Sequence, residues 1–329
     1  MTTQAVWITW ERQRRNRSMA RRVGAALYEF ESERRRLLRY CVLLWRTARV
    51  ILRSRPDIIY FQNPSIMLAI AVVVMKSLRL TRAAIVGDFH NAGVCPPVGR
   101  VLVPFLARGC DLVIVSNKSL ETRVVRMGAR CLSLPDPLPE LPMIPAVRSQ
   151  DGKFRVLMVC SWADDEPVAE VLRAAENLLT CSPSVAFEIT GRPSLERRGW
   201  SRPLPENVSL TGFLSETEFV RKLRSSDLVM DLTTREDCMV CGAYEAVSAE
   251  VPIIVSANEP MMRYFRKGAV FTDNSADSIT QCIVDAVARR EVLAREVKEL
   301  KYGILAEEGN MVQTVVDAVE EAVSRRRRA

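Results

Sequence analysis

The sequence of 329 residues predicts an α/β protein with two similar domains, each built around a parallel β-sheet. Short apolar runs that are typical of buried strands alternate with helical patterns along the whole chain, which is longer than one typical domain core. Five prolines within residues 134–145 interrupt this alternation, and the same pattern then starts again. We therefore expect a first domain over residues 1–135, a linker over 136–152, a second domain over 153–300, and a helical segment with a basic tail over 301–329.

The composition is that of a globular protein with an excess of basic residues. There are 47 Lys and Arg against 39 Asp and Glu, which gives a net charge of +8, and 48% of the residues are hydrophobic. Such a charge favours nucleic acid, anionic membranes or anionic substrates as partners. Aromatic residues make up only 6% and no zinc-finger or RNA-binding pattern is present, so we expect no nucleic-acid partner.

Nine scattered cysteines and a single histidine argue against a zinc site and a disulfide framework. Cys238 and Cys241 form a C-x-x-C pair, which is a redox motif in some proteins, but no second pair accompanies it. Because the chain is large and shows no cleavable signal, we expect reduced thiols in the cytoplasm. The apolar run at 66–75 is shorter than the roughly 20 residues that a membrane span needs.

The first strand, at residues 6–10, runs into a basic segment at 11–18, and a helix is expected over 19–26. The basic segment has no glycine, so it matches neither a P-loop nor a dinucleotide fingerprint. Its guanidinium groups suit bidentate binding of a diphosphate, although a solvated basic loop explains the same residues. The arginines in question are Arg14, Arg15 and Arg17.

Residues 33–51 form a strongly helical segment in which apolar and arginine residues mingle around the whole circumference. Tyr40 and Trp45 are aromatic anchors of the kind found at membrane interfaces, and basic residues near an anionic leaflet contribute about 1 kcal/mol each. We expect contact with the inner face of the cell membrane. The alternative is a helix packed on its own domain with a charged outer edge.

The rest of the first domain alternates strands and helices, predicted as strands at 56–62, 83–86 and 111–117 and helices at 65–78 and 118–127.

The strand at 83–86 is followed by Asp88, His90 and Asn91. Ligands of open parallel sheets bind at the carboxyl ends of strands, so the sole histidine is a candidate for hydrogen bonding to a ligand or stabilising charge. A purely structural histidine is the alternative.

The second domain repeats the alternation, with strands predicted at 154–159, 185–190, 208–213, 228–230 and 251–255 and helices at 277–308 and 311–325. The first of these strands leads into a loop whose Asp164, Asp165 and Pro167 signal a helix start. The second strand ends at Gly191 and Arg192.

Residues 231–256 hold the most informative stretch, a strand–loop–helix–strand unit. Its loop feeds a helix N-terminus, where backbone N–H groups and a partial positive charge suit phosphate. Asp237 and Glu245 bracket the helix start, and carboxylates beside a phosphate site suit hydroxyl groups, which donate to them. Sugar hydroxyls next to a nucleoside diphosphate would meet both demands. An ordinary α/β crossover with a capping acid is the alternative.

This stretch resembles the E-x7-E segment of glycosyltransferase family 4 (group 1), retaining enzymes of the GT-B fold that make bacterial polysaccharides and glycolipids. Asp237-x7-Glu245 and the following Pro252-Ile253-Ile254 carry the resemblance. Further similarities are "PDIIYFQNP" at 56–64, "D-x-H-N" at 88–91 and "N-V-x-L-x-G-F" at 207–213. The chain departs from the family pattern in having Asp for the first Glu, Val240 for a common Gly, and no Arg/Lys pair after the strand at 154–159.

The resemblance implies two Rossmann-like domains that face each other across a cleft, with the terminal helix crossing back to the first domain. It implies that the first acid faces the donor sugar, that the second binds the ribose, and that amides between them bind the diphosphate. His90 and Asp237 are then the catalytic residues. The donor-binding residues are Ser161, Trp162, Gly191, Arg192, Thr234, Arg235, Met239, Cys241, Gly242 and Glu245. The acceptor-binding residues are Arg14, Arg15, Arg17, Asp88 and Asn91.

The expected function is transfer of a sugar, a hexose, from a nucleoside-diphosphate sugar to a hydroxyl of a lipid-linked acceptor, with retention and without a metal or cofactor. A catalytically inactive GT-B-like scaffold of a membrane assembly is the main alternative, which the departures at Asp237 and after residues 154–159 favour. A sugar-nucleotide epimerase is a weaker alternative, because it needs a set of catalytic acids and bases that a single histidine does not supply.

Overall fold

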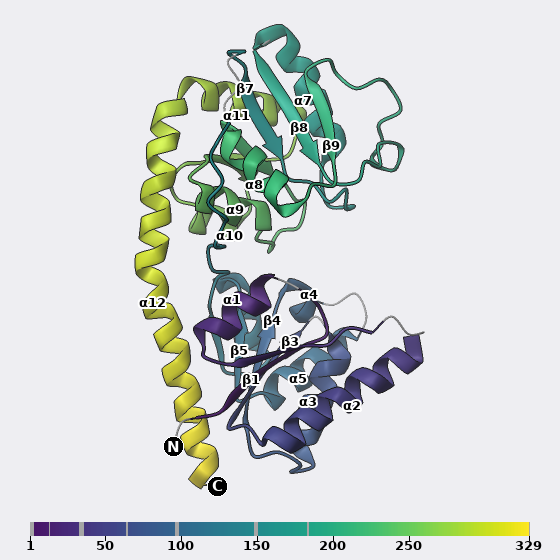
Figure 1. Cartoon of the computed structure of the whole chain (residues 1–329), viewed down its shortest axis with the longest axis vertical. Coiled ribbons are helices and arrows are strands. Elements are labelled where there is room, and N and C mark those ends of the chain that lie inside the picture. Colours follow the sequence, from purple (N-terminus) through teal and green to yellow (C-terminus); the bar gives the residue numbers. More distant parts are fainter. Residues whose placement is uncertain are drawn as a thin grey trace. The chain divides into compact units, whose positions relative to one another are not determined.

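The structure, a computed structural model, describes residues 3–12, 14–32, 36–63, 65–95, 99–147, 151–182 and 184–328. The chain forms two units: unit 1 comprises Met1–Pro137 and Glu307–Ala329, and unit 2 comprises Leu138–Ala306. Each unit contains a six-stranded sheet whose strands all pair in parallel, with helices on both faces (Figure 1).

Unit 1 has its strands in the order β2-β1-β3-β4-β5-β6. Its elements are β1 (Ala5–Thr9), α1 (Arg14–Arg22), β2 (Ala26–Glu29), α2 (Arg36–Ser54), β3 (Ile58–Asn63), α3 (Ile66–Ser77), β4 (Ala84–Phe89), α4 (Asn91–Val94), the 3-10 helix η1 (Arg100–Leu102), α5 (Val103–Gly109), β5 (Leu112–Val115), α6 (Lys118–Arg126), β6 (Cys131–Ser133) and the last part of α12 (Arg290–Arg328).

Successive residues of the buried strands in unit 1 face opposite sides of the sheet. Val6 and Ile8 of β1 pack with apolar residues of α2, α3, α5 and α6, whereas Trp7 packs with α1 and with Val315 and Val319 of α12. Burial on both faces explains why these strands read as almost continuous apolar runs in the sequence.

The helix that was expected over residues 19–26 is wrong in its bounds, because α1 begins at Arg14 and ends at Arg22. Gly24, at φ 64°, and the bond from Ala25 N–H to the Ala20 carbonyl end the helix there. The next residues are then free to form β2, an unpredicted strand that pairs with β1.

A buried ion pair holds α1 at the carboxyl end of the sheet. Arg15 donates from Nε and Nη2 to the two carboxylate oxygens of Asp88, at 3.1 and 2.8 Å, and also pairs with Asp136. Burial raises the pKa of Asp88, but the charges of Arg15 and His90 outweigh this effect and hold that pKa below its usual value.

Unit 2 has its strands in the order β12-β11-β10-β7-β8-β9. Its elements are β7 (Phe154–Met158), α7 (Val168–Cys181), β8 (Val185–Thr190), the 3-10 helix η2 (Glu196–Arg198), β9 (Val208–Gly212), α8 (Glu216–Ser225), β10 (Leu228–Asp231), α9 (Cys241–Ala249), β11 (Ile253–Ser256), α10 (Glu259–Tyr264), β12 (Ala269–Thr272), α11 (Ala276–Ala288) and the first part of α12.

One face of this second sheet packs with α7 and α11, and the other packs with α8, α9, α10 and the start of α12. The expected break between helices near residue 309 is wrong, because the break lies at Arg289 and α12 continues from there to Arg328. Residues 138–147 belong to unit 2 and pack on its core: Leu138 is buried there, and Ser248 Oγ donates to the Pro139 carbonyl at 2.5 Å.

Gly268, just before β12, tests how closely α12 packs on unit 2. Gly268 has a φ of +64°, and a Cβ added there would lie 2.5 Å from Val297 Cα. Gly212 has a similar φ of +70° but open space around it. We expect Gly268→Ala to lower the free energy of unfolding by about 3 kcal/mol and Gly212→Ala by about 1 kcal/mol. Urea unfolding of both variants measures the two losses in free energy of unfolding. Equal losses would show that α12 can move away from residue 268 to accommodate a Cβ.

The Arg15–Asp88 pair predicts a pH-dependent stability of unit 1. Asp88→Asn leaves a buried Arg15 with one fewer charge partner, so we expect a loss of about 3 kcal/mol at pH 7. Because the pKa of folded Asp88 is depressed, its contribution is present above the unfolded value of about 4 and declines as pH falls below it, so the two proteins should converge in acid.

Asp57→Asn is the matched control for this measurement. Asp57 pairs with Arg327 at 2.8 Å at the surface, where we expect a loss below about 1 kcal/mol. Urea unfolding between pH 3 and 7 compares the variants, and an Asp88→Asn loss no larger than the control loss contradicts the role of the buried pair.

Candidate functional site

The strand order of unit 2 reverses between β7 and β10. From β7 the chain proceeds to β8 and β9 in one direction, whereas β10, β11 and β12 extend in the other. Ligands of open parallel sheets bind outside the carboxyl ends of the strands at such a point. Two loops meet this condition, the β7–α7 loop at 159–167 and the β10–α9 loop at 232–240, and together with the start of α9 they contain most of the predicted donor-binding residues.

The β7–α7 loop is held tightly against the end of β8. Trp162 is buried with φ +65°, a conformation that is strained for a residue other than glycine, and its Nε1 donates to the Thr190 carbonyl at 2.9 Å. A Cβ at Gly191 would lie 2.1 Å from the Cys160 carbonyl, so only glycine fits there. Two predicted residues, Trp162 and Gly191, are thus brought into contact.

Glu166 accepts the donors of this loop. Ser161 donates from both N–H and Oγ at 2.9 Å, and the N–H of Ala163 donates at 2.8 Å. The predicted donor-binding residue Ser161 is exposed, but its N–H is already bonded to a carboxylate of the same chain. Sequence reasoning assigned no role to Glu166.

Asp231, the last residue of β10, links that strand to α9. Its Oδ2 accepts the N–H of Gly242 at 2.7 Å, and a Cβ at Gly242 would lie 2.6 Å from the same oxygen. Burial raises the pKa of Asp231 well above its usual value; the Gly242 N–H opposes this, while Glu166 and Glu245 raise it further. The predicted residues Gly242 and Glu245 therefore lie around a buried acid whose role sequence reasoning missed. The sequence pattern that could have indicated Asp231 is an acidic residue at the end of an apolar strand.

Asp165 joins the two loops. Its carboxylate accepts Thr233 Oγ1 at 2.7 Å and pairs with Arg235 at 2.9 Å, and its carbonyl accepts the Thr234 N–H at 2.8 Å. The predicted residues Thr234 and Arg235 are exposed at this edge, and Asp165 orients the Arg235 guanidinium.

The other predicted residues of this segment line the approach to α9. Asp237 and Met239 are partly exposed, Cys241 is the exposed first residue of the helix, and Glu245 lies partly exposed one turn later. Asn258 Nδ2 donates to the carbonyls of Arg235 and Cys238 at 3.2 and 3.1 Å and so holds the loop in place.

Arg198 brings a positive charge that the β7–α7 loop itself lacks. Its side chain is only 9% exposed, its Nη1 donates to the Ala163 carbonyl at 3.0 Å, and its Nη2 pairs with Asp164. This contact could not be predicted from the sequence, because Arg198 lies in η2, after β8, and is far along the chain from the β7–α7 loop. The predicted Arg192 is exposed after β8, with its guanidinium carbon 6.0 Å from the Phe213 ring centroid.

The residues predicted to bind the acceptor lie in unit 1 and are mostly engaged with acids. Arg15 is buried against Asp88, and Arg17 donates to Glu29 at 3.1 Å. The side chain of Arg14 lies outside the described residues. Asn91 begins α4.

His90 lies at the carboxyl edge of the first sheet, with Nε2 3.3 Å from Asp88 Oδ2 and a partly exposed side chain. The strand order of unit 1 reverses between β1 and β3, and there Thr9 donates to Gln62 Oε1 at 2.7 Å. Gln62 Nε2 lies 3.5 Å from His90 Nε2. Sequence reasoning missed Thr9 and Gln62, which show as polar residues at the ends of apolar strands.

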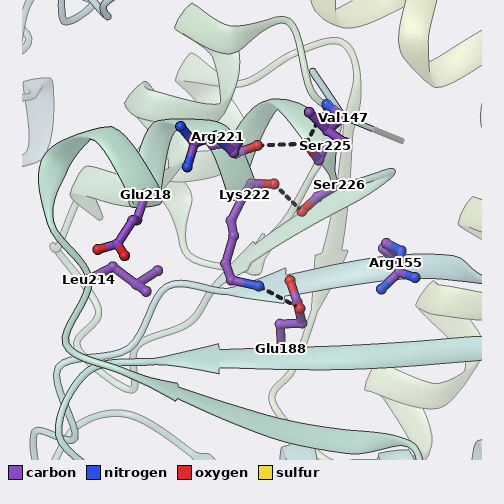
Figure 2. Close-up of a pocket in the computed structure, with 9 residues that line it drawn as sticks. All are labelled: Val147, Arg155, Glu188, Leu214, Glu218, Arg221, Lys222, Ser225 and Ser226. Carbon is purple, nitrogen blue, oxygen red and sulfur yellow. Dashed lines mark hydrogen bonds and ion pairs between the residues drawn. The ribbon is translucent and has the colours of Figure 1, made fainter. Parts of the chain in front are cut away.

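A hollow of about 380 Å³ lies beneath α8 (Figure 2). Lys222 and Glu188, which line it, pair at 2.7 Å, and Ser226 Oγ donates to the Lys222 carbonyl. The lining residues include none of those predicted for the donor site. Within the described ranges, no group of three or more His, Cys, Asp or Glu side chains is placed to hold a metal ion.

The fold of this chain is similar to that of several solved structures. No protein-family model and no curated protein sequence matches the chain. HepE from Anabaena, solved with UDP, superposes with a TM-score of 0.68 at 12% identity, over 97% of this chain and 100% of HepE. Trehalose 6-phosphate synthase from Burkholderia multivorans gives 0.69 at 11% identity, over 98% and 100%. A glycosyltransferase from Rickettsia africae gives 0.67 at 10% identity, over 98% and 99%. The chain therefore has the two-unit GT-B fold.

Proposed function

We propose that this protein is a glycosyltransferase that moves a sugar from a nucleoside-diphosphate sugar to a hydroxyl group. One observation carries the proposal. The β7–α7 loop, the β10–α9 loop, the start of α9 and Glu245 lie together where the strand order of unit 2 reverses. HepE, which has the same fold, was solved with UDP and with UDP-glucose, and this supports a nucleotide ligand of the same class.

In the proposed site, each residue type has a chemical task. Glu245 accepts hydrogen bonds from the ribose hydroxyls, and Asp237 accepts them from the donor sugar. Arg235 and Arg198 offset the charge of the diphosphate, since Asp165 and Asp164 hold their guanidinium groups at the loops. Most of the rate enhancement then comes from positioning the donor and stabilising the leaving diphosphate.

His90 remains a proposed catalytic residue, with Asp88 beside its ring. The resemblance to glycosyltransferase family 4 supports a hexosyl donor and transfer with retention as further parts of the proposal.

One observation favours the non-catalytic scaffold as a second candidate. The N–H groups of Ser161, Ala163 and Gly242, which lie where phosphate would bind, are already bonded to Glu166 and Asp231. A diphosphate at this edge meets several carboxylates, so its binding depends on the arginines.

We propose a lipid-linked acceptor and an anionic membrane as the partners of unit 1. Helix α2 buries Leu43, Thr47 and Ile51, while Leu38, Trp45 and Leu52 form an exposed apolar line at 56%, 59% and 49% exposure. An arginine line runs beside it, seven residues apart at each step: Arg39, Arg46 and Arg53.

Other elements of unit 1 also expose apolar side chains. They lie on α3, the residues after it, η1 and α5, namely Met67, Val74, Leu78, Leu80, Val101, Leu102 and Phe105. Between residues 36 and 109 there are eleven Lys and Arg against two acids, Asp57 and Asp88, which pair with Arg327 and Arg15. Apolar side chains edged by cations suit an anionic bilayer surface. Among the helices in the described part of the chain, none has the length and apolar character to cross a bilayer.

A thermal-shift panel tests the donor site. We expect one of UDP, GDP or ADP, or its sugar conjugate, at a hundred times its dissociation constant to stabilise the protein by about 2.7 kcal/mol. Glu245→Gln should sharply reduce this shift, because it removes the charge and replaces one of the two oxygens that accept the ribose hydroxyls with an NH2 donor. Glu206→Gln, an exposed acid of the same unit, should behave like the wild type. If no nucleotide stabilises the wild type, the transferase proposal fails and the scaffold is favoured.

Vesicle sedimentation tests the membrane surface. We expect the wild type to sediment with phosphatidylglycerol vesicles at low salt but not with phosphatidylcholine vesicles. The triple variant Arg39→Gln, Arg46→Gln and Arg53→Gln should lose about 3 kcal/mol, roughly a 150-fold weaker binding.

The control removes the same charge from unit 2, with Arg221→Gln, Arg263→Gln and Arg295→Gln, all of which are exposed. Equal losses in the two triple variants would mean that net charge, and not the α2 surface, drives binding.

A further inference from the structure

A series of buried hydrogen bonds in unit 1 leads from the first strand to His90. Its members, here called the amide network, are Trp7 and Thr9 of β1, Asn16 of α1 and Gln62 of β3, and each is at most 1% exposed. Buried polar groups are normally hydrogen-bonded, and a side-chain amide has a donor end and an acceptor end. The network therefore determines which atom of each amide faces which neighbour.

The indole of Trp7 determines the orientation of both amides. Its Nε1–H can only donate, and the atom that accepts from it at 3.0 Å is Asn16 Oδ1. The Nδ2 group of Asn16 then faces Gln62 and donates to its Oε1 at 2.8 Å, and Thr9 Oγ1 donates to the same oxygen at 2.7 Å. Because its oxygen is engaged on this side, Gln62 turns its Nε2 group, which can only donate, towards His90.

Two protein atoms consequently compete for one nitrogen of the His90 ring. Gln62 Nε2 lies 3.5 Å from His90 Nε2, and Asp88 Oδ2 lies 3.3 Å from the same nitrogen. An unprotonated Nε2 accepts a hydrogen bond from Gln62, whereas a protonated Nε2 donates one to Asp88. The carboxylate therefore favours a proton on this nitrogen, and the amide opposes it.

The charge of Asp88 is itself shared with other groups. Arg15 of α1 donates to both of its carboxylate oxygens, and Asp136 pairs with Arg15 in turn. Helix α4, which begins directly after His90, carries no charged residue. In the described part of the chain, Nδ1 of His90 has no hydrogen-bond partner, so it is the ring nitrogen that a ligand can meet.

We propose that Gln62 is a positioning residue for His90, and that Trp7 and Asn16 fix the direction of its amide. The N–H of Gln62 opposes protonation of Nε2, so Asp88 does not hold the ring as a cation and Nδ1 stays available to a ligand hydroxyl. The inference rests on the proposed function only for the role given to His90, because the arrangement of the hydrogen bonds is independent of that role.

Nuclear magnetic resonance of His90 tests the proposal, because the chain contains a single histidine. In the untagged full-length protein with isotope-labelled histidine, a pH titration of the two ring nitrogens reports the protonation of each. Gln62→Glu replaces the donor with a negatively charged acceptor, so we expect the titration of the ring to move to higher pH by about one unit or more. Gln62→Met only removes the donor and should move the titration in the same direction by less.

Trp7→Phe tests the network at a distance, since the indole is bonded to Asn16 and not to His90. Without the indole N–H both amides can turn, and Gln62 can then present its oxygen to the ring, so we expect the titration to move to higher pH. Trp10→Phe is the matched control. It removes another buried indole of unit 1, whose Nε1 donates to Thr47 at 3.0 Å, and the ring should titrate as in the wild type.

Gln4→Glu controls for charge alone, because the exposed Gln4 precedes β1, at the opposite end of that strand from Thr9. The proposal is overturned if both Gln62 variants titrate like the wild type, or if Gln62→Glu and Gln4→Glu give equal shifts. Equal shifts in Trp7→Phe and Trp10→Phe also overturn it. If Gln62→Glu does not fold, Gln62→Met and the tryptophan variants decide. Failure of every nucleotide in the thermal-shift panel would overturn the proposed function and leave these ring measurements unaffected.

Discussion

The buried carboxylate of Asp231 is the interaction on which the architecture of unit 2 depends at its functional edge. It ends a central strand and accepts an N–H from the first turn of α9, so the strand and the helix are joined at a distance of 2.7 Å. That bond determines where α9 begins, and therefore where Glu245 lies. Only glycine fits at 242, since a larger residue would push against the carboxylate itself.

Unit 1 uses the same solution with different residues. Asp88 lies near the carboxyl end of β4 and binds Arg15 of α1, as Asp231 binds the start of α9. In both units a buried acid at or near a strand end secures the start of a helix that contains predicted site residues. Burial raises the pKa of both acids. The charges of Arg15 and His90 nevertheless hold the pKa of Asp88 below its usual value, whereas neighbouring carboxylates raise the pKa of Asp231 further.

The two-unit α/β architecture and most of its strands could be predicted from the sequence, because strands buried on both faces leave long apolar runs. Glu245 and Gly242 could be found for a related reason, since a loop between a strand and a helix has a recognisable local pattern.

Contacts between distant segments could not be found in this way. Arg198 reaches the β7–α7 loop from η2, and Arg15 is neutralised by an acid 73 positions away. Local sequence patterns do not indicate which distant residues such side chains contact. The same limitation hid β2, whose residues are only partly buried and pair with β1 after a helix that ends earlier than expected.

The path of the chain through its two units has a consequence for biosynthesis. Unit 2 is a continuous segment, whereas unit 1 is interrupted after Pro137 and resumes at Glu307. Val315, Val319 and Ala322 of the resumed segment cover one face of the first sheet, against Trp7 and Tyr60. During synthesis on the ribosome, that apolar face of the first sheet therefore stays uncovered by α12 until unit 2 has been made. Unit 1 begins first but can complete its fold only last.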